Sequence, residues 1–210
     1  MQENSFKFFT LNYWRSIDKK ILFCFLILFF LGLFFSFSST SSLAGERLNK
    51  DYYFFFTKHL IFTVLAISIM MIISFIRTEV LIKLVIPAFV VSFIFLAIVP
   101  IIGVEVKGAR RWLNLYFFNL QPVEILKPLF ILMTVKILTY ENFQNYHIKY
   151  FLSFILLSCV IILLIDQPDL GQSILLTSSW IATVFVSGVS LIYIGIFLTI
   201  FLILFSSLLF

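Results

Sequence analysis

Four residues of types that bind anions lie close together in Gly103–Pro128, a charge-dense stretch between long apolar runs. They are Lys107, Arg110, Arg111 and Trp112. Arginine presents a planar set of donors that matches phosphate oxygens in pairs, and lysine adds a point charge. At a membrane surface this set would suit a lipid diphosphate head group. The alternative is that the side chains anchor the chain among lipid head groups without a specific ligand. Gly108 suggests a close backbone approach.

Glu124 and Lys127 follow Gln121 and Pro122 at the start of another apolar run. Proline fits the first turn of a helix, and a spacing of three residues puts Glu124 and Lys127 on one helix face. Ionisable groups inside a membrane span are costly and usually paired. The pair is interpreted either as a salt bridge that orders the helix start or as an anion site in which Glu124 holds Lys127. Pro128 predicts a local kink.

Asp166 and Asp169 are two carboxylates on either side of Pro168, at the end of a further apolar run. Paired carboxylates can divide acid and base roles when their environments differ. The alternative is that Asp169 caps the next helix, where the helix dipole favours a negative charge. Gln-Pro followed by an acidic residue occurs at 121 and again at 167. Both copies are predicted to open spans from the same side of the membrane.

The composition excludes a soluble globular domain. Of 210 residues, 62% are hydrophobic and only 12% are charged, whereas soluble domains carry roughly 25% charged residues. The apolar runs are long enough to cross a bilayer core of ~30 Å, and they do not alternate as the strands of a transmembrane barrel would. The fold class predicted is all-α, a polytopic helical membrane protein.

About seven transmembrane helices are predicted, forming a single integral membrane domain over residues 1–210 with a cytoplasmic lead-in at residues 1–20. An uncleaved first span is favoured over a signal peptide, because the apolar run is long and more spans follow. A charged turn is expected at 77–83, a polar loop at 103–120 and a polar turn at 140–149. The predicted spans are Ile21–Phe37, His59–Ile76, Leu84–Ile102, Pro122–Leu138, Phe151–Ile165, Leu170–Val186 and Leu191–Phe210.

The basic N-terminal segment places the N-terminus in the cytoplasm. Eight basic residues then lie inside and seven outside, a small excess for the usual rule. Four of the outer seven belong to the charge-dense stretch, namely Lys107, Arg110, Arg111 and Lys127. We interpret them as cations that are kept outside because a function on that side requires their positive charge.

No cofactor is evident in the sequence. Cys24 and Cys159 lie in apolar runs and are interpreted as small core residues, and His59 and His147 have no partner at ligand spacing. A divalent cation is plausible beside a diphosphate, although no ligand set is visible. The net charge of +5 is attributed to anionic lipids and orientation signals, and no nucleic-acid partner is expected.

Three motifs in the correct order resemble the SEDS (FtsW/RodA) family of bacterial cell-wall polymerases. KGARRWL at 107–113 is similar to the family's Gly-Ala-x-Arg-Trp loop, and QPVEILK at 121–127 to its Gln-Pro-Ser-Glu-x-x-Lys helix start. QPDLGQS at 167–173 is similar to its Gln-Pro-Asp-x-Gly segment. The residues of these motifs are most like those of the division-specific, FtsW-like branch. Val123 departs from the pattern, since the family usually has Ser there.

This resemblance implies the polymerisation of lipid II into peptidoglycan strands, with undecaprenyl diphosphate as the leaving group. Such chemistry needs a base for the attacking hydroxyl and positive charge at the diphosphate. A subsidiary hypothesis is that Asp166 or Asp169 acts as this base. The implied substrate-binding residues are Lys107, Arg110, Arg111, Trp112, Gln121, Glu124 and Lys127.

Family members resemble one another in having roughly ten spans of bilayer-crossing length. We therefore expect the sequence to be the N-terminal part of a longer protein, inactive alone, with the catalytic base on an outer loop beyond Phe210. The implied partners are a class B penicillin-binding transpeptidase and other division proteins in the bacterial cytoplasmic (inner) membrane. A lipid II transporter and a non-catalytic division scaffold stay open as alternatives.

Overall fold

The computed structural model describes residues 17–39, 53–106, 108–116, 118–141 and 145–188, together with residues 192, 195, 196 and 199. The chain divides into two compact units, Met1–Thr78 and Glu79–Phe210, and each is described by itself below. Within these described residues, four helices are long and apolar enough to cross a membrane. The protein is therefore a multi-pass helical membrane protein, as the composition predicts. The single-domain organisation stays a prediction.

The first unit pairs helix α2 (Lys19–Ser39) with helix α4 (Phe54–Phe75). Asp18 begins α2, because its carboxylate accepts a hydrogen bond from the amide of Lys20 at 2.9 Å. The ring of His59 lies close to the backbone of α2 at Gly32, where an added Cβ would make an ordinary contact with it at 3.6 Å. His59 thus packs between the two helices.

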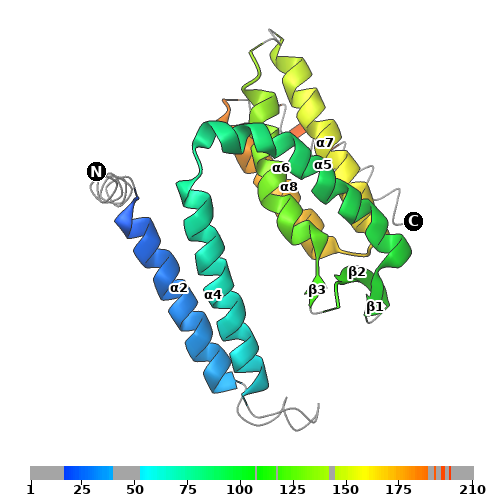
Figure 1. Ribbon diagram of the computed structural model, residues 1–210. Helices are drawn as coiled ribbons and strands as arrows, with labels where there is room; N and C mark the ends of the chain where they lie inside the picture. Colours follow the sequence, from blue (N-terminus) through cyan, green and yellow to red (C-terminus); the bar gives the residue numbers. More distant parts are fainter. Residues whose placement is uncertain are drawn as a thin grey trace. The chain divides into compact units, whose positions relative to one another are not determined.

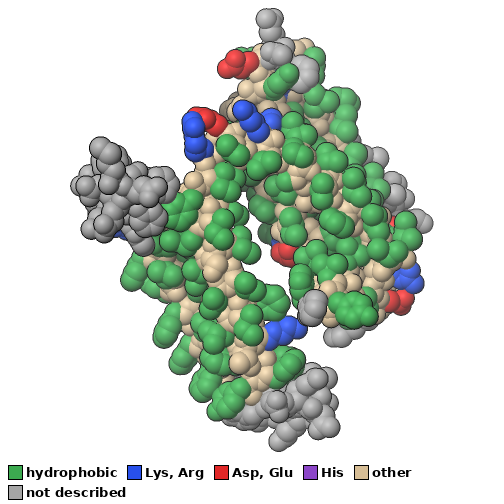
Figure 2. Space-filling model, in the orientation of Figure 1, with side chains coloured by type: hydrophobic (Ala, Val, Ile, Leu, Met, Phe, Trp, Pro, Cys, Tyr) green, Lys and Arg blue, Asp and Glu red, His purple; other side chains and the backbone are tan. Residues whose placement is uncertain are grey.

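The second unit contains helices α5 (Thr78–Ile102), α6 (Pro122–Leu138), α7 (Tyr146–Asp166) and α8 (Leu170–Val186), drawn in Figure 1. Helices α6, α7 and α8 pack on one another, and α5 adds Phe89 and Leu96 to their core. The Trp180 indole is buried at the centre and donates a hydrogen bond to the Ser153 hydroxyl at 3.2 Å. Figure 2 shows hydrophobic side chains over most of the visible helix surface, as contact with lipid requires.

The six predicted spans up to Val186 each coincide with a described helix, with small shifts at their ends. The charged turn expected at 77–83 is mostly helical, because α5 already begins at Thr78, with Glu79 in its first turn. The seventh predicted span lies outside the described residues except for residues 192, 195, 196 and 199. The count of seven spans therefore stays a prediction.

The segment expected as a polar loop at 103–120 folds instead into a small antiparallel sheet. Its strands are β1 (Val104–Val106), β2 (Ala109–Asn114) and β3 (Asn119–Leu120), in the order β1-β2-β3. Gly108 adopts φ +78° before β2, a conformation that favours glycine. No atom lies within 4 Å of a Cβ added there. The glycine therefore serves the turn, and a close backbone approach to a ligand stays a prediction.

Helix α5 contains a gap in its hydrogen bonding that the turn between α7 and α8 fills. Pro100 has no amide proton, so the Leu96 carbonyl lacks its usual helical donor. The side-chain amide of Gln167 donates to that carbonyl at 2.9 Å. Both Leu96 and Gln167 are buried. This bond fixes the α7–α8 turn against α5.

Candidate functional site

Four helix ends and the sheet meet at one end of the second unit (Figure 1). Helices α5 and α7 finish there, and helices α6 and α8 begin there. A helix carries partial positive charge at its start and partial negative charge at its finish. Whether a charged residue at this end is stabilised therefore depends on which helix terminus it faces.

Strand β2 separates side chains that the sequence places next to one another. Ala109 and Leu113 are buried and Arg111 is partly buried, whereas Arg110, Trp112 and Asn114 are exposed. This alternation follows from the two-residue period of a strand. Arg111 thus faces the helices. Arg110 and Trp112 lie on the other face of the strand.

Arg111 holds the turn that follows helix α7. Its Nε donates to the Gln167 carbonyl at 3.2 Å, and its Nη2 donates to the Pro168 carbonyl. The same Nε lies 3.8 Å from a carboxylate oxygen of Asp169. A guanidinium at the carbonyl end of a helix is favourable for both hydrogen bonding and the dipole. The geometry accounts for Arg111 as a structural cation, whatever ligand it also contacts.

Arg110 makes the corresponding contact at the end of helix α5. Its Nη1 donates to the Pro100 carbonyl at 3.3 Å, and its Nη2 lies 3.5 Å from the Glu105 carboxylate. Both partners of this ion pair are about half exposed, so the pair contributes little to stability.

Asp169 joins the starts of helices α6 and α8. One carboxylate oxygen accepts from the amide of Gln172 at 3.4 Å, which caps α8, and the other accepts from the side-chain amide of Gln121 at 3.3 Å. With Arg111 close by, both oxygens of this buried carboxylate are engaged. The capping interpretation of Asp169 describes this geometry well. The two Gln-Pro segments, predicted to open spans from the same side, are in direct contact.

Glu124 and Lys127 form an ion pair of 2.7 Å in the first turns of helix α6. The second Glu124 oxygen accepts from the side-chain amide of Gln172 on helix α8 at 3.0 Å. The Lys127 side chain is only 20% exposed, whereas that of Glu124 is 51% exposed. This arrangement holds an ammonium group close to the end of the bundle.

The structure therefore gathers Arg111, Gln121, Glu124, Lys127 and Asp169 at the starts of α6 and α8. It places Arg110 and Trp112 on the opposite face of β2. Lys107 lies outside the described residues, and Asp166 is exposed at the end of α7. Within the described chain, no three His, Cys, Asp or Glu side chains come close enough to hold a metal ion, so a divalent cation stays a prediction.

Two glutamines with specific contacts were given no role in the sequence analysis. Gln167 completes the hydrogen bonding of α5, and Gln172 holds Glu124. The proline at position 100 is a signal for the first, because it leaves a carbonyl that needs a donor. Gln172 stands three residues after Asp169, in the first turn of α8, but its contact with another helix has no signal in a single sequence.

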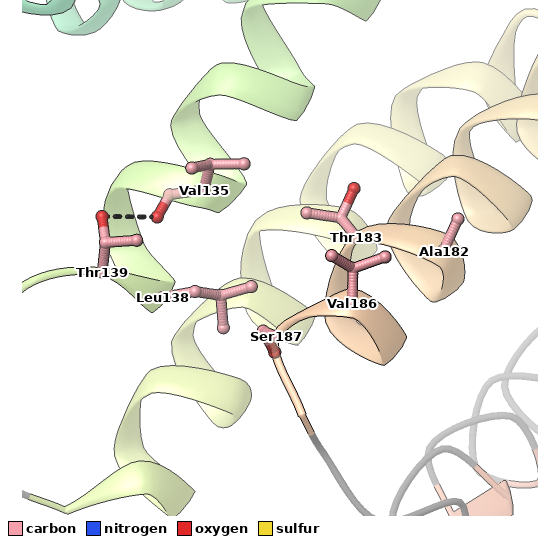
Figure 3. Close-up of a pocket in the computed structure, with 7 residues that line it drawn as sticks. All are labelled: Val135, Leu138, Thr139, Ala182, Thr183, Val186 and Ser187. Carbon is pink, nitrogen blue, oxygen red and sulfur yellow. Dashed lines mark hydrogen bonds between the residues drawn. The ribbon is translucent and has the colours of Figure 1, made fainter.

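A cavity of about 440 Å³ lies at the other end of helices α6 and α8. Figure 3 shows Val135, Leu138 and Thr139 of α6 facing Ala182, Thr183 and Val186 at the end of α8. The Thr139 hydroxyl donates to the Val135 carbonyl of its own helix. Among the described residues that line it, none is charged.

Comparison with known proteins identifies the family. A family model that groups FtsW, RodA and SpoVE, described as "Cell cycle protein", matches residues 18–210. The chain belongs to this family. The SEDS resemblance of the three motifs is thereby confirmed.

Several members called "Probable peptidoglycan glycosyltransferase FtsW" are similar to the chain. The one from Coxiella burnetii is 31% identical over 180 residues, which cover 84% of this chain and 48% of that protein. The one from Caulobacter vibrioides is 31% identical over 189 residues, covering 87% and 47%. The chain thus spans about half the length of the curated relatives that it matches.

Two solved structures share the fold. The Thermus thermophilus rod shape determining protein RodA aligns with a TM-score of 0.60 at 25% identity, covering 81% of this chain and 58% of RodA. A second structure, described as "Structural coordination of polymerization and crosslinking by a peptidoglycan synthase complex", aligns with a TM-score of 0.62 at 26% identity, covering 82% and 52%.

The departure at Val123 fits the fold, since this residue is 1% exposed in the apolar core.

Proposed function

We propose that this FtsW-like chain takes part in polymerising lipid II into glycan strands during bacterial cell division. In this reaction an acceptor sugar hydroxyl attacks the anomeric carbon of the donor. The bond from that carbon to the diphosphate oxygen breaks, and undecaprenyl diphosphate leaves. A base must take the hydroxyl proton, and positive charge must stabilise the diphosphate. The proposal assigns the second task to the cations at the starts of α6 and α8.

The position of Lys127 is the observation that carries this proposal. The charge at helix termini accounts for Arg110 and Arg111, because they face the C-terminal ends of α5 and α7. It also accounts for Asp169, which caps the N-terminal end of α8. It does not account for Lys127, which lies near the start of α6, where the helix dipole gives a cation no stabilisation. Placing an ammonium group there, four-fifths buried, requires a counter-charge. Glu124 supplies it in the free protein, and a diphosphate would supply more.

The ion pair uses one of the three N–H donors of the Lys127 ammonium group. The remaining donors can contact diphosphate oxygens while Glu124 holds the group in place. Arg111 adds positive potential from the α7–α8 turn, and Gln121 is proposed to contact the same substrate. Trp112 lies on the other face of β2, so its contact with the substrate stays a prediction from the sequence. Asp169 is not proposed as the base, because both of its oxygens are engaged. The base is assigned to a residue outside this site.

We further propose that the protein lies in the bacterial inner membrane with its N-terminus in the cytoplasm. The cation site then faces the outer surface, where lipid II is polymerised. A class B penicillin-binding transpeptidase is the proposed partner. The support is the similarity to a structure described as a peptidoglycan synthase complex that coordinates polymerisation and crosslinking.

The test compares Lys127→Ala and Lys127→Arg with the unchanged protein, each purified with its transpeptidase and supplied with lipid II. Glycan length is followed by gel. The proposal expects Lys127→Ala to lower the polymerisation rate by about 10²-fold or more, the usual effect of removing one transition-state donor. Lys127→Arg should retain more activity, because it keeps the charge. Equal rates for Lys127→Ala and the unchanged protein would refute the role, and lipid II translocation without polymer would favour the transporter.

A further inference from the structure

Gln172 links helix α8 to the Glu124–Lys127 pair. Its side-chain nitrogen donates to Glu124 Oε1 at 3.0 Å, while Glu124 Oε2 holds the Lys127 ammonium at 2.7 Å. The carboxylate therefore has one partner on each oxygen. These two contacts fix the plane of the carboxylate, and with it the position of the ammonium group.

The chemistry of the contact determines which way the Gln172 amide points. An ionised carboxylate only accepts hydrogen bonds, so the amide must present its nitrogen to Glu124. Its oxygen then points away from Glu124. That oxygen, Gln172 Oε1, is buried and has no hydrogen-bond partner in the described part of the chain.

An unpartnered buried oxygen makes Gln172 a poor choice for stability alone. Burying a polar atom without a partner is unfavourable. An apolar side chain of the same length, such as methionine, would fill this space without that disadvantage. It would also release Glu124. The presence of glutamine therefore points to the contact with Glu124 and not to core packing.

We propose that Gln172 is a positioning residue that holds Glu124 so that Lys127 is directed at an anionic diphosphate. This inference rests on the proposed function, because it assigns Gln172 a role in the same diphosphate site. Gln172 does not touch the substrate. It couples the start of α8, which Asp169 caps, to the cation on α6.

The test measures binding of farnesyl diphosphate to the full-length protein in lipid nanodiscs, together with its apparent melting temperature. Four variants are compared, namely Gln172→Met, Gln172→Glu, Lys127→Ala and Ser179→Ala. Ser179 lies on the same helix, and its hydroxyl donates to the Leu175 carbonyl of that helix at 2.8 Å. It is therefore the matched control.

Gln172→Met should weaken farnesyl diphosphate binding by about tenfold or more, the usual effect of losing a hydrogen bond to a charged group. Its melting temperature should equal or exceed that of the unchanged protein, because the unpartnered oxygen is removed. Gln172→Glu should weaken binding further, since a second carboxylate competes for Lys127. Ser179→Ala should change neither quantity. With lipid II as substrate, kcat should fall more than KM rises, because charge on the leaving diphosphate grows in the transition state.

Two results would overturn this inference alone. The first is Gln172→Met binding within twofold of the unchanged protein while Lys127→Ala binds weakly, which would leave the proposed function standing without Gln172. The second is weak binding accompanied by a clear fall in melting temperature, which would make Gln172 a structural residue. Full binding by Lys127→Ala would refute the proposed diphosphate role of Lys127 and this inference together.

Discussion

Replacing Gln167 with methionine tests how the turn between α7 and α8 is held to α5. The side-chain amide of Gln167 supplies the Leu96 carbonyl with the hydrogen bond that Pro100 cannot provide. Methionine has a similar length but no donor. The buried carbonyl would lose its partner, at a cost of about 1–3 kcal/mol. For a chain of this size, that corresponds to a melting temperature lower by roughly 2–12 °C.

The same reasoning predicts that Pro100→Ala rescues the loss. Alanine at position 100 has an amide proton that can reach the Leu96 carbonyl along the helix, so Gln167 is no longer needed for that bond. In the Pro100→Ala background, Gln167→Met should therefore cost far less. The difference between the two costs is the coupling energy, which we expect to be about 1–3 kcal/mol.

The assay is thermal unfolding of the detergent-solubilised protein at one scan rate, followed by tryptophan fluorescence, to which buried Trp180 contributes. Pro87→Ala is the matched control, because Pro87 lies in the same helix but well before Leu96 and Pro100. It should leave the cost of Gln167→Met unchanged. If Gln167→Met costs the same with proline and with alanine at position 100, then the Leu96 carbonyl is not the reason for the glutamine.

Two further comparisons use neighbouring residues as controls for each other. Arg111→Lys should lower the melting temperature by more than Arg110→Lys. The reason is that Arg111 bridges two carbonyls and a buried carboxylate, whereas Arg110 pairs with Glu105 at the surface. Equal shifts in melting temperature would contradict the division of β2 into two faces. Gly103→Ala should disrupt the end of α5, because its Cβ would lie 2.4 Å from the Val99 carbonyl oxygen. Gly108→Ala should lower the free energy of unfolding by only about 1–2 kcal/mol, because it places alanine in a left-handed backbone conformation. A Gly108→Ala protein less stable than Gly103→Ala would refute this reading of the two glycines.

The sequence predicts the helices well because hydrophobic runs of bilayer length have few alternatives. It also places the two Gln-Pro segments on the same side, and their contact through Gln121 and Asp169 agrees with that placement. The small sheet is missed because its strands are short and its charged residues are typical of a loop. Missing the strand also hides the separation of Arg110 from Arg111, which depends on a two-residue period.

Contacts between helices are the part of the site that one sequence does not reveal. The spacing of Glu124 and Lys127 predicts their ion pair, because both residues lie on one helix. The bonds of Gln172 to Glu124 and of Gln167 to Leu96 join positions 48 and 71 residues apart. Those bonds depend on how α8 and α7 pack against α6 and α5, and that packing is set by the whole core.

The pleat of strand β2 also limits which insertions and deletions this region can accept. One residue added or removed between Gly108 and Arg111 would exchange the two faces of the strand. The guanidinium that now holds the α7–α8 turn would face away from the helices, and Trp112 or Arg110 would face them. Length changes in the connection between β2 and β3, at residues 115–118, would leave that alternation intact. Natural variation in length should therefore concentrate there, and artificial tags or linkers introduced into this segment belong at the same place.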